Sequence, residues 1–366
     1  MSAQQQKALL LPSKHGKLVV GEREVPRPGR GQLLVKVGAS GLNPIDYKIQ
    51  DTGIFIEEYP AVLGVDISGV VEEVGEGAGK FVKGDKVQVI CRPLSLSLEL
   101  NTDVQLSFAH GQHGGDEAAF QQFALTVGDF TAKIPSSLDF DQAATVPLGF
   151  DTAASGLYAD KVGAALTPPW EHDGKGKYTG NPIFIVGGSG SVGSYAIQLA
   201  RLSGFAPIIT TASLTHASYL KSIGATDVID RHLSAKEVKA AVVNITRLPI
   251  EVAYDTTSLP STQKLAWSIL ADNGILVVTL QPVVKEEEGK GRKVIATFGS
   301  PHAPGNHELF EASWSVLGKW LEEGVIQANR LEILPNGLHG IDGGLQRMRK
   351  GQVSGTKLVA HPQEAV

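Results

Sequence analysis

The segment IFIVGGSGSVGSYAIQLARL, residues 183–202, joins an apolar run to an amphipathic stretch through a glycine-rich turn. Its glycines Gly188, Gly190 and Gly193 have the spacing G-x-G-x-x-G. Where such a turn connects a strand to a helix, its glycines permit the bend, the approach of a phosphate to the backbone, and close packing of helix on strand. The pattern therefore predicts a dinucleotide-binding turn made of Gly188, Ser189, Gly190, Ser191, Val192 and Gly193. A strand–turn–helix unit that binds nothing is the alternative.

The residues that follow alternate between strand-like and helix-like patterns. The expected helices are 191–202 and 217–223, and the expected strands are 183–186, 208–211, 228–229, 252–255 and 275–279. This alternation is typical of a doubly wound parallel sheet with helices on both faces. The first third of the chain instead has short β segments separated by glycines, which indicates a barrel-like domain; these segments are 32–37, 64–74 and 81–90.

The turn after the second expected strand indicates which dinucleotide is bound. An NAD site usually carries an acidic residue there to bind the ribose hydroxyl, and the segment PIITTASLTHASYLKS, 207–222, contains none. It offers instead the hydroxyls of Thr211 and Ser213 and the basic side chains of His216 and Lys221. This composition favours NADPH, whose additional phosphate is anionic. For His216 and Lys221, simple solvation on a helix surface is an equal alternative.

Composition excludes several other classes of function. The chain of 366 residues carries a net charge of −5, so no electrostatic attraction to nucleic acid or anionic lipid is expected. Its one cysteine cannot form an intramolecular disulfide. No secretory signal and no apolar stretch of membrane-spanning length are found, so we expect a cytoplasmic protein.

Several motifs in order along the chain carry a resemblance to the medium-chain dehydrogenase/reductase superfamily: GLNPIDYKI (41–49), LGVDISGVVEEVG (63–75), VKGDKV (82–87), AATVPLGFDTAASGL (143–157), IVGGSGSVG (185–193) and GQVSGTKLV (351–359). The resemblance implies an α/β protein with a GroES-like β-rich catalytic domain plus a Rossmann doubly wound parallel sheet. The implied domains are 1–136, the first part of the catalytic domain, 137–298, the dinucleotide-binding domain, and 299–366, the return to the catalytic domain.

Within this superfamily the chain resembles the zinc-free quinone oxidoreductase and enoyl reductase branch, most of all fungal stand-alone enoyl reductases that act in trans with polyketide synthases. Zinc-dependent relatives place a cysteine at Asn43 and a His-Glu pair at Val65-Asp66, and neither is present. The cluster His110, His113, Asp116 and Glu117 lies in a glycine-rich segment. We interpret it as a solvated loop, and we expect no metal.

Conjugate reduction suits a site without a metal. Hydride delivered to the β-carbon of an enone or enoyl thioester gives a delocalised enolate, which needs hydrogen-bond donors at its oxygen and a proton source. The resemblance implies that Lys48, Tyr47 and Asn43 supply these groups, and that Thr152 and the backbone at Leu280 lie near the nicotinamide. A solvated lysine at 48, a turn residue at 43 and a helix-start threonine at 152 are the alternatives.

Three functions therefore remain open. The first is NADPH-dependent reduction of an activated double bond on a small-molecule or carrier-bound α,β-unsaturated substrate. The second is quinone reduction by NADPH. The third is a catalytically silent NADPH-binding protein. The sequence leaves the choice between a monomer and a homodimer open.

Overall fold

The computed structural model describes residues 4–56, 58–78, 80–90, 97–101, 105–109, 115–286, 290–301 and 305–364. The chain divides into two compact units. Unit 1 consists of Met1–Leu148 and Pro301–Val366, and unit 2 is Gly149–Ser300. The C-terminal residues thus return to the first unit.

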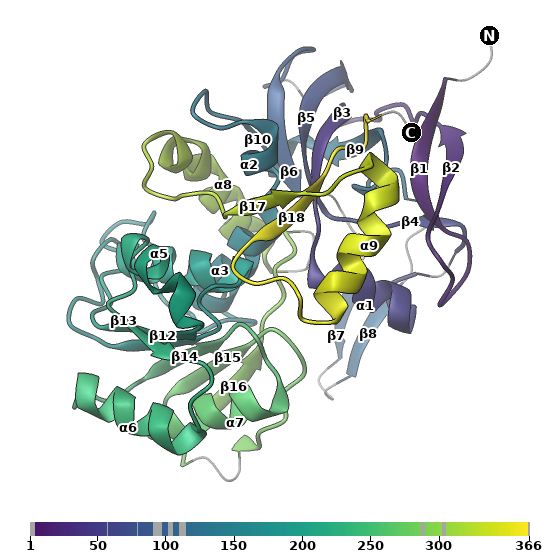
Figure 1. The fold of residues 1–366 in the computed structure, drawn as a ribbon. Helices are drawn as coiled ribbons and strands as arrows, with labels where there is room; N and C mark the ends of the chain where they lie inside the picture. The colour runs from purple at the N-terminus through teal and green to yellow at the C-terminus, as the bar shows by residue number, and fades with distance from the viewer. Residues whose placement is uncertain are drawn as a thin grey trace. The chain divides into compact units, whose positions relative to one another are not determined.

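Unit 1 is built mainly from antiparallel strands (Figure 1). A three-stranded sheet has the order β2 (Val19–Glu24), β1 (Gln5–Leu11) and β4 (Ala61–Val62). A seven-stranded sheet has the order β10 (Thr131–Lys133), β6 (Lys86–Ile90), β5 (Asp66–Val74), β3 (Gln32–Gly41), β18 (Lys357–Ala360) and β17 (Leu331–Ile333), with β9 (Phe123–Val127) paired to β3. Strands β7 (Ser97–Asn101) and β8 (Gln105–Ala109) form a separate hairpin.

Two helices of unit 1 lie side by side, α1 (Pro44–Thr52) and α9 (Gly337–Arg349) (Figure 1). The Arg349 guanidinium binds Asp51 of α1 through Nε and Nη2, at 2.9 and 2.8 Å. Just before α1, the N–H of Leu42 donates to the carbonyl of Leu358 in β18, at 2.9 Å. The start of α1 therefore rests on the C-terminal strand. The remaining helical elements of unit 1 are η1 (Gly128–Phe130), α2 (Phe140–Ala143) and α8 (His307–Glu322).

Helix α2 belongs to unit 1, although residues 137–148 were expected in the dinucleotide-binding domain. Phe140 and Ala144 pack against Ala39 of β3 and Val359 of β18. The Ser68 hydroxyl of β5 also donates to the Phe140 carbonyl, at 2.6 Å. These apolar contacts with the large sheet explain why this segment groups with the first unit, since their burial stabilises it there.

Unit 2 is a six-stranded parallel sheet, as the alternation of strands and helices predicts. Its strand order is β13 (Asp227–Asp230), β12 (Ile208–Ala212), β11 (Ile183–Val186), β14 (Val252–Asp255), β15 (Ile275–Val278) and β16 (Lys293–Ala296). The helical elements are α3 (Pro147–Tyr158, beginning in unit 1), α4 (Ser191–Leu202), η2 (Leu214–His216), α5 (Ala217–Ser222), α6 (Ala235–Ile245) and α7 (Pro260–Ile269). Strand-centre residues Phe184, Ile209, Ala253 and Leu276 are fully buried. Unbroken apolar strands of this kind are typical of a sheet covered on both faces.

Across the ranges that the structure describes, no helix is both long enough and apolar enough to span a bilayer.

The C-terminal tail is held to unit 1 by a histidine between two carboxylates. His361 Nε2 lies 2.6 Å from Asp141 Oδ1, and its Nδ1 lies 3.0 Å from Glu364 Oε1. Burial alone lowers the His361 pKa, but the hydrogen bonds to Glu364 and Asp141 outweigh burial and raise it overall. Because the folded-state pKa is raised, this contribution to stability is complete below the unfolded pKa and is lost as pH rises through the folded pKa.

We therefore expect His361→Gln to lower the free energy of unfolding by about 1 kcal/mol at pH 6, after allowance for partial exposure. The difference from the parent protein should shrink as the pH rises through the raised pKa of His361. Thermal melting of the two proteins across this pH range measures the difference. A difference independent of pH would contradict the interpretation.

Candidate functional site

The turn after β11 has its left-handed residue at Gly187, one position before the predicted motif. Gly187 has φ of 82°, a conformation that residues with a Cβ rarely adopt. The N–H groups of Gly187 and Gly188 both donate to the Thr211 carbonyl of β12, at 3.1 Å. Gly187 lies outside the predicted turn of residues 188–193, although it makes the bend. Its doublet with Gly188 was the available signal.

The three motif glycines are required for different reasons. A Cβ at Gly188 would lie 2.2 Å from Thr210 Oγ1, and one at Gly193 would lie 2.3 Å from the Gly187 carbonyl oxygen. Internal packing therefore accounts for these two glycines. A Cβ at Gly190 would meet only the Gly187 carbonyl oxygen, at 3.4 Å, an ordinary contact. Gly190 is exposed, so nothing in the described fold explains a glycine at this position.

A bound phosphate would explain Gly190. Gly190 is the N-cap of α4, whose first turn begins with Ser191 and Val192. The first N–H groups of a helix have no partner inside it, and the helix dipole favours an anion there. Bare backbone at Gly190, with Ser189 beside it, leaves room for a pyrophosphate against these groups. The residues present thus fit the dinucleotide that the sequence predicts.

The strand order places this turn at the switch point of the sheet. Strand β11 pairs with β12 on one side and with β14 on the other. In an open parallel sheet, ligands bind outside the carboxyl ends of the strands where the order reverses. The elements at that edge are the glycine turn, the turn after β12 that starts at Ser213, and the segment after β15 that contains Leu280.

The turn after β12 presents hydroxyls, and the helix that follows it, α5, carries Lys221 in its last turn. Ser213 and Thr215 hydroxyls lie 2.9 Å apart, and Thr215 was not among the predicted residues. Lys221 is exposed and His216 is half-buried. Thr211 differs from these because it is only 4% exposed and its hydroxyl accepts the Gly187 N–H at 3.3 Å. Its contacts therefore support the glycine turn.

Two more predicted cofactor residues lie in unit 2. Thr152 lies in the second turn of α3, which starts at Pro147, so a helix-start role does not explain it. Gly299 packs closely against Thr152, since a Cβ at 299 would lie 2.4 Å from its hydroxyl. Leu280 is 36% exposed. It follows Thr279, whose N–H donates to the Ser258 hydroxyl at 2.7 Å and so fixes this segment.

Helix α1 of unit 1 presents Tyr47 and Lys48. The Tyr47 ring lies 5.3 Å from the Arg349 guanidinium carbon, a cation–π distance. Burial raises the Tyr47 pKa, and Arg349 opposes this rise. Lys48 is half-buried, and burial lowers the pKa of its ammonium. Within the described part of the chain, the Lys48 ammonium has no hydrogen bond or ion pair.

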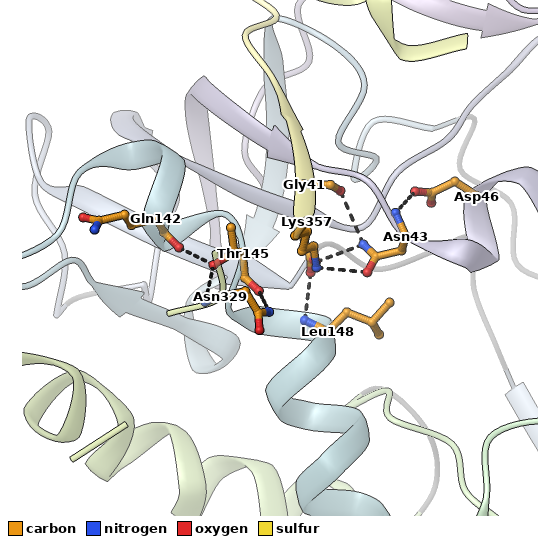
Figure 2. A network of polar contacts seen from close by, with 9 residues as sticks. Gly41, Asn43, Asp46, Gln142, Thr145, Leu148, Asn329 and Lys357 are labelled. Atoms are coloured by element: carbon orange, nitrogen blue, oxygen red, sulfur yellow. Dashed lines mark hydrogen bonds and ion pairs between the residues drawn. The ribbon is translucent and has the colours of Figure 1, made fainter. Parts of the chain in front are cut away.

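Asn43 lies in a buried polar network (Figure 2). Its amide Nδ2 donates to Asp66 Oδ2 at 2.9 Å and to the Gly41 carbonyl at 3.3 Å. Its Oδ1 accepts a hydrogen bond from Lys357 Nζ at 3.0 Å, and Lys357 forms a close ion pair with Asp66. Asn43 is 3% exposed. Its amide is therefore committed to internal partners.

Asp46 is the second carboxyl beside this network. Its Oδ2 accepts the Asn43 N–H at 2.7 Å, which closes the first turn of α1. Burial raises the Asp46 pKa to about 8, and the Asn43 hydrogen bond only partly opposes the rise. Burial thus disfavours the charged form of Asp46, whereas Asp66 is paired with the Lys357 ammonium.

These donors do not fit a catalytic zinc. Zinc requires a set of thiolate, imidazole or carboxylate ligands. Val65 is apolar, Asn43 offers an amide, and the one carboxylate, Asp66, is already paired with Lys357. In the other predicted cluster, Asp116 forms a close ion pair with Arg23, and Glu117 accepts a hydrogen bond from Gln32 at 2.9 Å. His110 and His113 lie outside the described residues.

Comparison with known proteins gives consistent matches. Residues 29–136 match the alcohol dehydrogenase GroES-like domain family, and residues 191–287 match the zinc-binding dehydrogenase family. The chain is 30% identical over 365 residues to trans-enoyl reductase resD of Aspergillus sclerotiorum, covering 93% of this chain and 96% of that protein. It is 32% identical over 351 residues to trans-enoyl reductase himH of Aspergillus japonicus, covering 93% of each. An alcohol dehydrogenase superfamily protein from Novosphingobium aromaticivorans has a similar structure, with a TM-score of 0.75 at 25% identity over 97% of this chain and 98% of that one.

The fold and these similarities define an oxidoreductase with a GroES-like unit and a dinucleotide-binding unit. The chain belongs to the medium-chain dehydrogenase/reductase superfamily, in the branch of quinone oxidoreductases and enoyl reductases that includes the fungal trans-enoyl reductases. The resemblance inferred from the sequence motifs is thereby confirmed.

Alanine substitutions at two glycines test the role of the turn. We expect Gly190→Ala to leave the melting temperature nearly unchanged but to weaken binding of the nicotinamide dinucleotide by about 100-fold, equivalent to about 3 kcal/mol. Gly193→Ala should instead destabilise unit 2 by about 1–3 kcal/mol, because its Cβ overpacks the turn. Fluorescence titration and thermal melting distinguish the two effects. Unchanged affinity in Gly190→Ala would show that this turn holds no phosphate.

Proposed function

We propose that this chain is an NADPH-dependent reductase of activated carbon–carbon double bonds in enones or enoyl thioesters, working without a metal. The observation that carries the proposal is the half-buried Lys48 ammonium, which has no partner within the described part of the chain. A desolvated, unpaired cation is unfavourable in a folded protein unless a ligand uses it. An anionic enolate oxygen is such a ligand. The names of the trans-enoyl reductase relatives support the same chemistry.

The cofactor, when bound, supplies hydride to the β-carbon of the substrate. Lys48 then donates a hydrogen bond to the carbonyl oxygen, where negative charge develops during the transfer. Its lowered pKa brings the ammonium nearer to the pKa of a useful proton donor. The Tyr47 hydroxyl, on the adjacent residue of α1, is a second donor in the proposal. We assign Asn43 a positioning role, since its amide is buried and engaged.

The preference for NADPH rests on the turn after β12. Ser213 and Thr215 place two hydroxyls together, and the helix that follows carries an exposed lysine, Lys221, in its last turn. No acidic residue occurs in 207–222 to bind a free ribose hydroxyl or to repel a phosphate. Hydroxyls with a lysine are suited to the additional phosphate of NADPH.

The substrate is proposed to be a small α,β-unsaturated carbonyl compound or an acyl chain on a carrier. A polyketide synthase is the proposed partner, because the resemblance to fungal stand-alone enoyl reductases implies it and the trans-enoyl reductase relatives are consistent with it. A cytoplasmic location and a monomeric or homodimeric state remain part of the proposal.

Substitution of Lys48 tests the proposal directly. We expect Lys48→Met to lower kcat for an enone or enoyl thioester by about 100-fold to 1,000-fold, the typical effect of losing one oxyanion donor. NADPH affinity should stay the same, because Lys48 is proposed to act on the substrate oxygen and not on the cofactor. The alkaline limb of the parent pH–rate profile should lie below the pKa of an ordinary lysine and should be absent in Lys48→Met. NADPH oxidation is followed by absorbance.

Lys36→Met is the matched control, because Lys36 is an exposed lysine on β3. Equal turnover by the parent and Lys48→Met would exclude Lys48 from the reaction. If the parent oxidises NADPH only with quinones, the quinone reductase alternative replaces this proposal. If it binds NADPH but turns over none of these substrates, the catalytically silent alternative replaces it.

A further inference from the structure

Unit 1 contains a lysine whose charge is fully enclosed. The Lys357 side chain is 2% exposed and that of Asp66 is 0% exposed. The ammonium forms a close ion pair with Asp66 and donates to Asn43 Oδ1 at 3.0 Å. Burial of a lysine is strongly unfavourable unless its charge is compensated in this way.

The strand beside Lys357 leaves room for this side chain. A Cβ at Gly41 of β3 would lie 2.9 Å from Lys357 Cε and 2.4 Å from the Ala144 carbonyl oxygen. Neither of these can move away easily, because Lys357 is held by its ion pair and Ala144 by backbone. A side chain at position 41 would therefore collide with both groups, and glycine at this position leaves the space that the Lys357 side chain occupies.

The network connects the starts of two helices. Asp66 Oδ1 accepts the N–H of Leu148, in the first turn of α3, at 2.8 Å. Asp66 Oδ2 accepts from Asn43, the N-cap of α1, and from Lys357. Residues Tyr47 and Lys48 follow on α1, directly after Asp46 closes its first turn. The start of α1 therefore takes its position from a lysine that is distant in the sequence.

We infer that Lys357 is a positioning residue for the reduction: its ammonium is an internal cation that holds Asn43 and Asp66 together and thereby fixes Lys48 on α1. This inference deepens the proposed function and rests on it for the reacting role of Lys48. Without the ammonium, the buried Asp66 carboxylate loses its compensating charge and α1 loses the anchor of its N-cap.

The experiment separates charge balance from positioning. Lys357→Met alone leaves a buried uncompensated carboxylate and should lower the melting temperature strongly. The double variant Asp66→Asn with Lys357→Met removes both charges and should recover most of that loss. Because the anchor is still missing, we expect the double variant to bind NADPH normally but to have kcat lowered at least about 10-fold with a smaller change in KM.

The matched control neutralises a second ion pair of unit 1 in the same way. Glu332→Gln with Arg347→Met removes the pair between β17 and α9, whose Nη1 to Oε1 distance is 2.6 Å. Neither Glu332 nor Arg347 belongs to the network of Asn43, Asp66 and Lys357 that anchors the start of α1, so kcat should equal that of the parent.

Two readouts do not depend on turnover. Hydrogen exchange of the α1 amides should be at least about 10-fold faster in the Asp66/Lys357 double variant than in the control, because the helix start frays when its anchor is lost. The acylation rate of Lys48, followed by mass spectrometry, should approach that of an exposed lysine. If the parent reduces no enone, the proposed function fails, and these readouts still decide whether Lys357 positions α1.

Parent-like kcat together with parent-like exchange in the double variant would overturn the inference. If that variant does not fold, Asn43→Ala provides the same test, since it cuts the link to α1 and leaves the Asp66–Lys357 pair intact. The same loss of kcat and protection is expected, and parent-like values would overturn the inference there too.

Discussion

The ion pair between Lys357 and Asp66 is the interaction on which the candidate site of unit 1 depends. It joins β18, near the C-terminal end of the chain, to β5 and to the N-cap of α1. A buried pair of this kind contributes little net stability compared with apolar packing, because desolvation offsets most of the attraction. The pair instead specifies one local structure, since the carboxylate and the ammonium can each be satisfied by only a few arrangements of hydrogen-bond partners. The starts of α1 and α3 are thereby fixed by the same carboxylate.

The glycine turn of unit 2 shows a similar separation between folding and function. Gly187 and Gly188 shape the turn against β12, and Gly193 permits α4 to pack on it. Gly190 contributes nothing to that packing. Gly190 is thus the one motif glycine that packing does not explain. This tells more than the motif spacing alone, because it indicates the point where a ligand would touch the backbone.

Much of unit 2 follows from the sequence because its signals are local. The apolar run 183–186, the turn and the helix 191–202 are contiguous, so their periodicity predicts β11 and α4 without knowledge of distant residues. The boundary near residue 148 does not follow, because α2 is placed by contacts with β3 and β18. The burial of Asn43 could not be predicted from the sequence either, since its partner Lys357 is 314 positions away. The sequence shows a lysine in the tail motif SGTKLV, but only the folded structure, in which this side chain is 2% exposed, reveals that it is buried.

The central proposal is that this chain transfers hydride to the β-carbon of an activated double bond without a metal, with the Lys48 ammonium donating to the oxygen where charge develops. The most direct measurement uses chelator-treated protein, an enone and NADPH carrying deuterium at the transferring position, with the product examined by NMR. The account predicts deuterium on the β-carbon and a rate unaffected by chelator or added zinc. Product without label on that carbon, or activity that disappears with chelator and returns with zinc, would contradict it.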